Sequence, residues 1–501
     1  MSSGPGILTV RRRAGVLLPL ASVPGRLAGA FGPEGRRILD WLQAAGMSWW
    51  QILPPTPLGA GDSPYGGASA FALEPLHLSL EDLAAEGLLP RPRPHHAPPA
   101  GGPLDYPALR HAREPLLRRA FQEWQAAGGG RSSAFRRFQQ EEHSWLRDWC
   151  RFRVLDRRHR GPWTTWPAPL RRREPRALAA LDREFGAELE YEAFLQFQLH
   201  RQGRRMSREA HRRGLRILGD LPLFVVHHSA DVWARPELFQ LDREGRPRFL
   251  TGVPPDYFSS RGQLWGHPHY AWAAHRREGF AWWKERFRRS RVLADAMRLD
   301  HFIGFHRVWK VPAGAADARR GRWSRSPGRE LLEALRADLG RLPCLAEDLG
   351  AVVPAVHRLR EHFGLPGMRV LQFGFGGDEH HALHRIPEDA AVYPGTHDND
   401  TVLGWARSAP AAERRRALAA TGLGRGELER LPWALVAAAW ASPAALALAS
   451  FPDLLGLGRE GRINRPGTAR GNWRWRLARR QLSGTLCRRL RDLTEATRRV
   501  P

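Results

Sequence analysis

The chain has 501 residues, of which 42% are hydrophobic, and its 78 lysine and arginine residues against 51 aspartate and glutamate residues give a formal net charge of +27. Glycine and proline, 50 and 40 residues, stay below the share typical of low-complexity chains, so the composition predicts a folded globular protein. All basic residues except Lys284 and Lys310 are arginines spread along the chain, which indicates a codon-biased, solvated surface and no nucleic-acid partner.

The N-terminal region has the features of a secretory signal. The basic residues Arg11–Arg13 precede the apolar run 14–21, and Ala-Gly-Ala at 28–30 resembles a cleavage site. The run is short and contains Pro19. We therefore interpret Val16–Leu18 as part of a buried strand and expect a cytoplasmic protein.

Eight short apolar runs follow one another along the chain, and stretches with helical spacing, such as 34–45 and 328–339, lie between them. Nearly all-apolar strands that alternate with helices predict a parallel sheet covered on both faces. Eight such units predict an α/β fold of the (β/α)₈ TIM-barrel type, whose active site lies at the C-terminal ends of the strands. The runs are Gly15–Ser22, Ser48–Leu53, Leu215–Leu221, Ala296–Asp300, Pro343–Glu347, Met368–Phe373, Ala390–Pro394 and Ala444–Ser450.

Two stretches between the predicted strands are too long for a single crossover. We expect residues 80–205 to form a largely helical insertion and residues 224–283 an aromatic-rich insertion, both at the rim of a single catalytic domain 1–501. Long structured loops above a barrel rim usually shape a binding cleft. The helices predicted in the first insertion are Ala108–Ala127, Ser132–Phe152 and Glu188–Arg213.

The stretch 433–451 has 19 residues without a charge, about the length that spans a bilayer. Alanine dominates it and Ser442-Pro443 interrupts it. We therefore predict a packed helix followed by a buried strand, and no membrane association.

The cysteines Cys150, Cys344 and Cys487 lie far apart and form no CxxC pair. This pattern predicts neither a disulfide framework nor a zinc site, and it favours a reducing compartment. Because neither a metal-ligand spacing nor a phosphate-binding loop is apparent, we expect no cofactor and no metal.

Carboxylates follow several of the predicted strands, at the end that faces a barrel active site. They are Asp220, Asp300, Glu347 and Asp398. Any one of them alone is most simply a helix cap or a surface acid. Arg298 lies two residues before Asp300, so both side chains point to the same side of a strand, and a buried arginine would keep Asp300 ionised.

Glu347 follows the apolar residues 344–346, a setting that raises the pKa of a carboxyl group and favours a proton donor. One ionised and one protonated carboxyl group are what glycosyl transfer through a covalent intermediate requires. The abundant aromatic residues fit sugar rings, whose C–H faces stack on tryptophan and tyrosine.

Longer motifs along the chain are more specific than these single residues. They are Asp62-Ser63-Pro64-Tyr65, Gly219-Asp220-Leu221-Pro222, Ser229–Trp233, Gly252–Ser259, Gly262–Gly266, Arg298–Phe302, Ala346–Gly350, Gly395–Thr401, Asn464–Thr468 and Gly471–Arg476. With these motifs in this order, the chain resembles, from about residue 15 to residue 477, the 4-α-glucanotransferases of the α-amylase clan, called amylomaltase or disproportionating enzyme.

The resemblance implies a barrel without a separate C-terminal β-domain, maltooligosaccharides and α-1,4-glucans as substrates, and a retaining transfer to the 4-OH of an acceptor. It implies that Asp300 is the nucleophile, that Glu347 is the acid and then the base, and that Asp398 holds the 2- and 3-hydroxyls of the reacting sugar. The substrate-binding residues that it implies are Ser63, Tyr65, Asp220, Asp256, Tyr257, Phe258, Gln263, Trp265, Arg298, His301, His397 and Asn464, with 252–266 as the substrate loop.

The chain departs from the usual family pattern at Gly66, Ile303, Pro394 and Pro452, none of which removes a carboxylate of the predicted site. Two other interpretations stay open at this stage. One is a retaining hydrolase of the same clan, and the other is a basic scaffold or nucleic-acid protein with an inactive barrel. Neither the preferred glucan length nor the oligomeric state follows from these residues.

Overall fold

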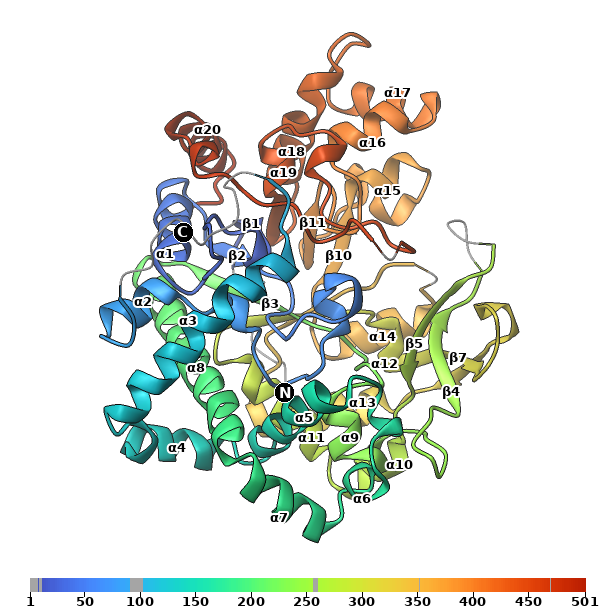
Figure 1. Cartoon of the computed structure of the whole chain (residues 1–501). Helices are drawn as coiled ribbons and strands as arrows, with labels where there is room; N and C mark the ends of the chain where they lie inside the picture. The colour runs from blue at the N-terminus through green and yellow to red at the C-terminus, as the bar shows by residue number, and fades with distance from the viewer. Residues whose placement is uncertain (1–7, 9–10, 91–101, 256–259, 351, 469) are drawn as a thin grey trace.

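The computed structural model describes residues 8, 11–90, 102–255, 260–350, 352–468 and 470–501. These residues include a closed barrel of parallel strands in the spatial order β1-β12-β11-β10-β9-β6-β3-β2 (Figure 1). The predicted barrel fold is confirmed, and each of the eight apolar runs contributes to one strand or lies beside it. The strands are β1 (Arg13–Leu17), β2 (Trp49–Gln51), β3 (Arg216–Leu221), β6 (Ala296–Leu299), β9 (Cys344–Ala346), β10 (Gly367–Val370), β11 (Ala390–Tyr393) and β12 (Leu446–Ser450).

The barrel is filled by side chains, so it is a packed core and not a channel. One apolar cluster takes at least one buried residue from every barrel strand, among them Leu17, Trp49, Leu218 and Leu345. A second and larger cluster lies between the strands and the surrounding helices, with Val16, Ile217 and Leu299 among its members. Because both faces of each strand are buried, the strands are apolar at nearly every position.

Helices cover the outside of the barrel. The predicted helix 34–45 is α1 (Pro33–Ala44), which begins with Pro33 at a position where proline costs no hydrogen bond. The C-terminal helix α20 (Gly484–Ala496) lies beside α1 in Figure 1, and the Trp41 indole Nε1 donates to the carbonyl oxygen of Ser483 at 3.4 Å. Other helices of this layer are α11 (Ala281–Ser290), α13 (Gly328–Leu339), α14 (Pro354–His362) and α18 (Leu431–Ala441).

The uncharged stretch 433–451 forms most of α18 and then β12, as predicted. Among the described residues, no helix is both long and apolar enough to cross a membrane. Cys150, Cys344 and Cys487 are all free thiols, the first two buried and the third partly exposed.

The chain between β2 and β3 is largely helical, and one prediction there is wrong. Instead of one helix over 132–152, the chain breaks at 142–145. The break buries Trp145 and turns Glu142 inward, where its Oε1 accepts from Arg289 Nη1 at 3.1 Å. The helices of this stretch are α2 (Leu80–Ala85), α3 (Tyr106–Ala126), α4 (Ser133–Glu141), α5 (Leu146–His159), α6 (Ala168–Arg171), α7 (Pro175–Glu184) and α8 (Gly186–Arg212).

A second, antiparallel sheet with the order β5-β4-β7-β8 stands beside the barrel (Figure 1). Two of its strands, β4 (Phe249–Val253) and β5 (Gln263–Pro268), come from the aromatic-rich stretch, whereas β7 (Arg307–Pro312) and β8 (Arg322–Arg325) follow β6. This second sheet was not predicted from the sequence. The remaining helices are α9 (Ala230–Ala234), α10 (Trp272–Arg277), α12 (Ile303–His306), α15 (Leu371–Phe375), α16 (Val402–Ser408), α17 (Ala411–Ala420) and α19 (Phe451–Leu454).

Candidate active site

Three neighbouring barrel strands bring the predicted carboxylates to one edge of the barrel. Asp220 lies near the end of β3, and Asp300 and Glu347 directly follow β6 and β9. The backbone holds these ends in register, because the Asp300 N–H donates to Leu221 O and the Glu347 N–H donates to Leu299 O, both at 3.1 Å. This is the edge at which barrel enzymes place their catalytic groups.

Arg298 joins two of these carboxylates. Its guanidinium is buried, and its Nε donates to Asp220 Oδ2 at 2.9 Å while its Nη2 donates to Asp300 Oδ1 at 2.8 Å. Asp220 is 2% exposed, whereas the Asp300 side chain is 28% exposed. The planar guanidinium therefore orients Asp300 toward the accessible side of the site.

A tyrosine and a histidine complete the hydrogen-bond network. The Tyr65 hydroxyl donates to Asp220 Oδ2 at 2.8 Å, accepts from Arg298 Nη2 at 3.1 Å and lies 2.8 Å from His397 Nε2. Because the single Tyr65 proton goes to Asp220, we assign the proton of His397 to Nε2. Burial lowers the pKa of His397, which favours this neutral ring, and its Nδ1 has no hydrogen-bond partner.

Glu347 is held by the backbone of the segment that follows the nucleophile candidate. The His301 N–H donates to Glu347 Oε2 at 2.7 Å, and His301 reaches this position with a left-handed backbone, φ 52°. Such a backbone is costly for a residue with a Cβ and is typical of functional sites. Burial, followed by the charge of Asp300, raises the pKa of Glu347 well above its usual range, so this carboxyl group can carry a proton.

Asp398 lies in the loop after β11 and is nearly half exposed. Its Oδ1 accepts from Asn464 Nδ2 at 2.6 Å, and its Oδ2 lies 3.4 Å from His397 Nε2. Asn464 is itself attached to this loop, since its N–H donates to the carbonyl oxygen of His397 at 3.1 Å. Asp398 thus presents an accessible carboxylate beside the buried network.

The remaining predicted residues divide into three groups. Ser63 caps the turn η3 (Pro64–Gly66), because its Oγ accepts from the N–H of Tyr65 at 3.2 Å. Trp265, on β5, reaches the site, with its ring 4.8 Å from that of His301 and perpendicular to it, and its Nε1 donates to Gln263 Oε1 at 3.3 Å. Three predicted residues lie outside the described residues, namely Asp256, Tyr257 and Phe258.

One aromatic residue of the site was not predicted. The Trp473 ring lies 5.7 Å from that of Tyr65 and 6.0 Å from that of His397, while Tyr65 and His397 stack at 5.5 Å with an angle of 11°. Trp473 belongs to the motif 471–476, so the signal was present in the sequence. Without the fold, nothing in that motif places Trp473 against residues some 80 and 400 positions away.

The arrangement combines an accessible carboxylate that is paired with a buried arginine and, on the next strand, a carboxyl group whose protonated form is favoured. This is the pair of groups that retaining chemistry at a sugar anomeric carbon uses. The aromatic side chains of Tyr65 and Trp265, both partly buried, contact Arg298 and His301 respectively and are of the kind on which sugar rings stack.

Comparison with known proteins gives concordant results. Residues 18–482 match the family model of glycoside hydrolase family 77, described as 4-alpha-glucanotransferase. The chain is 43% identical over 499 residues to the 4-alpha-glucanotransferase of Thermus thermophilus, covering 98% of this chain and 99% of that protein. It is 40% identical to the enzyme of Synechocystis, with 97% of each chain covered.

Among solved structures, the chain is similar to the amylomaltase from Streptococcus agalactiae in complex with acarbose. The TM-score is 0.92 at 30% sequence identity, and the match covers 98% of this chain and 100% of that one.

Proposed function

Since this chain belongs to the 4-α-glucanotransferase family and is an enzyme of that class, we propose that Asp300 and Glu347 carry out its reaction by a retaining double displacement on α-1,4-glucans and maltooligosaccharides. The proposal rests on two groups at the ends of the neighbouring strands β6 and β9. Asp300 is a carboxylate bound by an arginine, and Glu347 is a carboxyl group whose pKa is raised.

In the first step, Asp300 attacks the anomeric carbon C1 of the donor sugar. Arg298 donates to Oδ1, so we assign the attack to Oδ2. A bond forms between this oxygen and C1 while the bond from C1 to the leaving 4-oxygen breaks, and Glu347 gives its proton to that oxygen. The product is a β-glucosyl ester on Asp300, with the shortened glucan free to leave.

In the second step, the 4-OH of an acceptor glucan takes the place of the leaving group. The ionised Glu347 accepts the proton of this hydroxyl, the acceptor oxygen bonds to C1, and the ester oxygen of Asp300 leaves with the bonding electrons. Two inversions at C1 give net retention, so the new bond is again α-1,4.

The surrounding residues stabilise the reacting sugar. Asp398 is the accessible carboxylate beside this space, and we propose that it accepts hydrogen bonds from the 2- and 3-hydroxyls. Tyr65 and His397 face the same sugar, with Asp220 fixing the Tyr65 hydroxyl and Asn464 fixing Asp398. Preorganised partners of this kind are worth most where positive charge develops at C1 in the transition state.

Incubation of the pure protein with maltotriose tests the reaction type. We expect glucose together with a ladder of longer maltooligosaccharides, because each released segment is transferred to another sugar. Glucose and maltose without longer products would identify a hydrolase of the same clan, and no change at all would contradict both activities.

Transfer instead of hydrolysis requires that a sugar hydroxyl reaches the ester before water does. Trp265 is the described aromatic residue of the substrate loop that stands over His301, and we propose that it helps to exclude water. Trp265→Ala is expected to raise the ratio of hydrolysis to transfer severalfold, measured as reducing ends formed per maltotriose disproportionated.

The matched control is Trp323→Ala. Trp323 lies in the same antiparallel sheet, but its ring packs against that of Trp309 on β7, with 5.2 Å between the ring centroids. This control should keep the ratio of the unmodified enzyme. If Trp265→Ala also keeps that ratio, Trp265 has no part in excluding water.

A further inference from the structure

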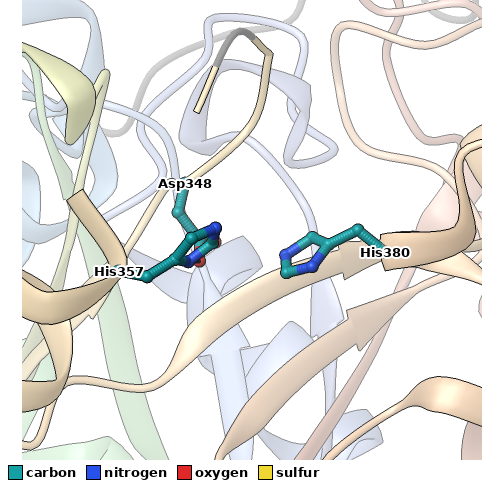
Figure 2. Close-up of side chains that lie close together, drawn as sticks. All are labelled: Asp348, His357 and His380. Carbon is teal, nitrogen blue, oxygen red and sulfur yellow. Dashed lines mark ion pairs between the residues drawn. The ribbon is translucent and has the colours of Figure 1, made fainter. Parts of the chain in front are cut away.

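A cluster of three side chains with metal-binding chemistry lies outside the active site. Asp348 follows β9, His357 lies on α14 and His380 lies in the short helix η10 (Glu379–His381). One ligand atom from each lies within 4.8 Å of the others. Figure 2 shows the His380 ring pointing toward His357 and Asp348 from the opposite side.

The cluster contains two buried polar atoms without a hydrogen-bond partner. Asp348 is 1% exposed, and its Oδ1 accepts from the Met368 N–H at 2.7 Å, whereas its Oδ2 makes no hydrogen bond and lies 3.9 Å from His357 Nδ1. The Nε2 of His380 is likewise buried and without a partner. Buried polar groups are nearly always satisfied in proteins, so the His380 nitrogen without a partner points to a ligand, whereas Asp348 Oδ2 has two arginines as ion-pair partners.

Two arginines approach the same carboxylate oxygen, and their charges must be considered. Arg360 Nε lies 3.4 Å and Arg369 Nη1 lies 3.8 Å from Asp348 Oδ2. Arg360 also pairs with Asp389 at 3.1 Å and with Glu361 at 3.6 Å. Three carboxylates, those of Asp348, Asp389 and Glu361, thus share the charge of the two guanidinium groups.

The arginines fit a second role. A carboxylate that binds a metal through one oxygen is usually oriented by further hydrogen-bond donors, and such outer partners tune the affinity. Here the Met368 N–H holds Oδ1, and Arg360 and Arg369 form ion pairs with Oδ2 but donate no hydrogen bond to it. Oδ2 is the oxygen that lies 3.9 Å from His357 Nδ1.

We propose that Asp348, His357 and His380 form a binding site for a divalent first-row transition metal, with Zn²⁺ as the probe. Two imidazole nitrogens and one carboxylate oxygen are a donor set that Zn²⁺ prefers, whereas Mg²⁺ and Ca²⁺ require mostly oxygen ligands. Three protein ligands leave a coordination position for water. His357 is 30% exposed, so the metal has a path from solvent. The ligands come from three separate segments, which is why no spacing in the sequence reveals them.

Calorimetric titration of the full chain with ZnCl₂ tests the proposal. The chain has 21 histidines, so the comparison must separate this site from scattered surface binding. His357→Ala and His380→Ala are each expected to weaken the tightest Zn²⁺ site at least about 10-fold. The matched controls are His362→Ala, on the same helix as His357, and His384→Ala, in the exposed turn η11 (Leu383–Arg385) near His380, and both should bind as the unmodified chain does.

Co²⁺ gives a second readout that does not depend on enzyme activity. Binding at this site should produce a visible d–d absorption band that is present in the unmodified chain and in both controls and absent from His357→Ala and His380→Ala. Equal Zn²⁺ affinity in all five proteins, or equal weakening in cluster and control variants, would overturn the proposal.

Discussion

Replacement of Asp300 by alanine is expected to lower the rate of glucan transfer from maltotriose by about 10⁴-fold or more, because the variant has no group to form the covalent intermediate. Arg298 keeps its partner Asp220 in this variant, so the barrel should remain folded. The measurement is the initial rate of glucose release, with thermal unfolding as the check on the fold. Asp40→Ala, which removes an exposed carboxylate of α1, is the matched control and should keep full activity.

The stereochemistry of rescue identifies Asp300 more sharply than loss of activity does. With α-maltosyl fluoride as donor and azide in solution, azide should enter the space left by the Asp300 side chain and attack C1 from that face, while fluoride leaves. The product of Asp300→Ala is then β-maltosyl azide. An α-azide, or a variant that still makes the maltooligosaccharide ladder, would refute the assignment of Asp300 as nucleophile.

The second large effect is expected from Glu347→Gln, which keeps the size of the side chain but cannot give a proton to the leaving oxygen. Transfer from maltotriose should fall by about 10²- to 10⁴-fold, the usual contribution of a general acid. Glu333→Gln, on the exposed face of α13, is the matched control and should leave the rate unchanged.

A donor that needs no protonation separates chemical from structural loss in Glu347→Gln. Fluoride leaves α-maltosyl fluoride unaided, so the first step should stay fast, whereas the second step lacks its base and becomes slow. The maltosyl ester on Asp300 should then accumulate and be found by mass spectrometry on the peptide that contains this residue. If the fluoride reacts as slowly as maltotriose and no ester forms, Glu347 does not act as the acid.

The barrel could be predicted because its strands are buried on both faces, so each is apolar at most positions, as in the run 446–449. The second sheet could not be predicted in the same way. Most residues of its strands β7 and β8 are partly or fully exposed, and the strands therefore carry charged residues, as loops do. These residues are Arg307, Lys310, Arg322 and Arg325. Long helices were also predictable. The exception is the predicted helix 132–152, which is interrupted at 142–145, where Glu142 turns inward and contacts Arg289.

The candidate site also has residues that could be predicted from the sequence and contacts that could not. Asp220, Arg298, Asp300 and Glu347 could be found because strand ends in a parallel barrel meet at one edge, whatever the intervening loops do. The contact of Trp473 with Tyr65, and the approach of His357 and His380 to Asp348, depend on how distant segments pack. Such contacts between distant segments cannot be predicted from local sequence patterns.

The pairing of β4 with β7 has a mechanical consequence. β4 leads into the segment predicted to be the substrate loop, and it pairs with β7 from Phe249 opposite Pro312 to Gly252 opposite Trp309. β7 in turn is the direct continuation of the short segment 300–306 that begins at Asp300. The start of the segment 252–266 is therefore hydrogen-bonded to the stretch of backbone that continues from Asp300. A ligand that shifts β4 is therefore expected to shift β7 as well and, through the segment 300–306, the backbone of Asp300.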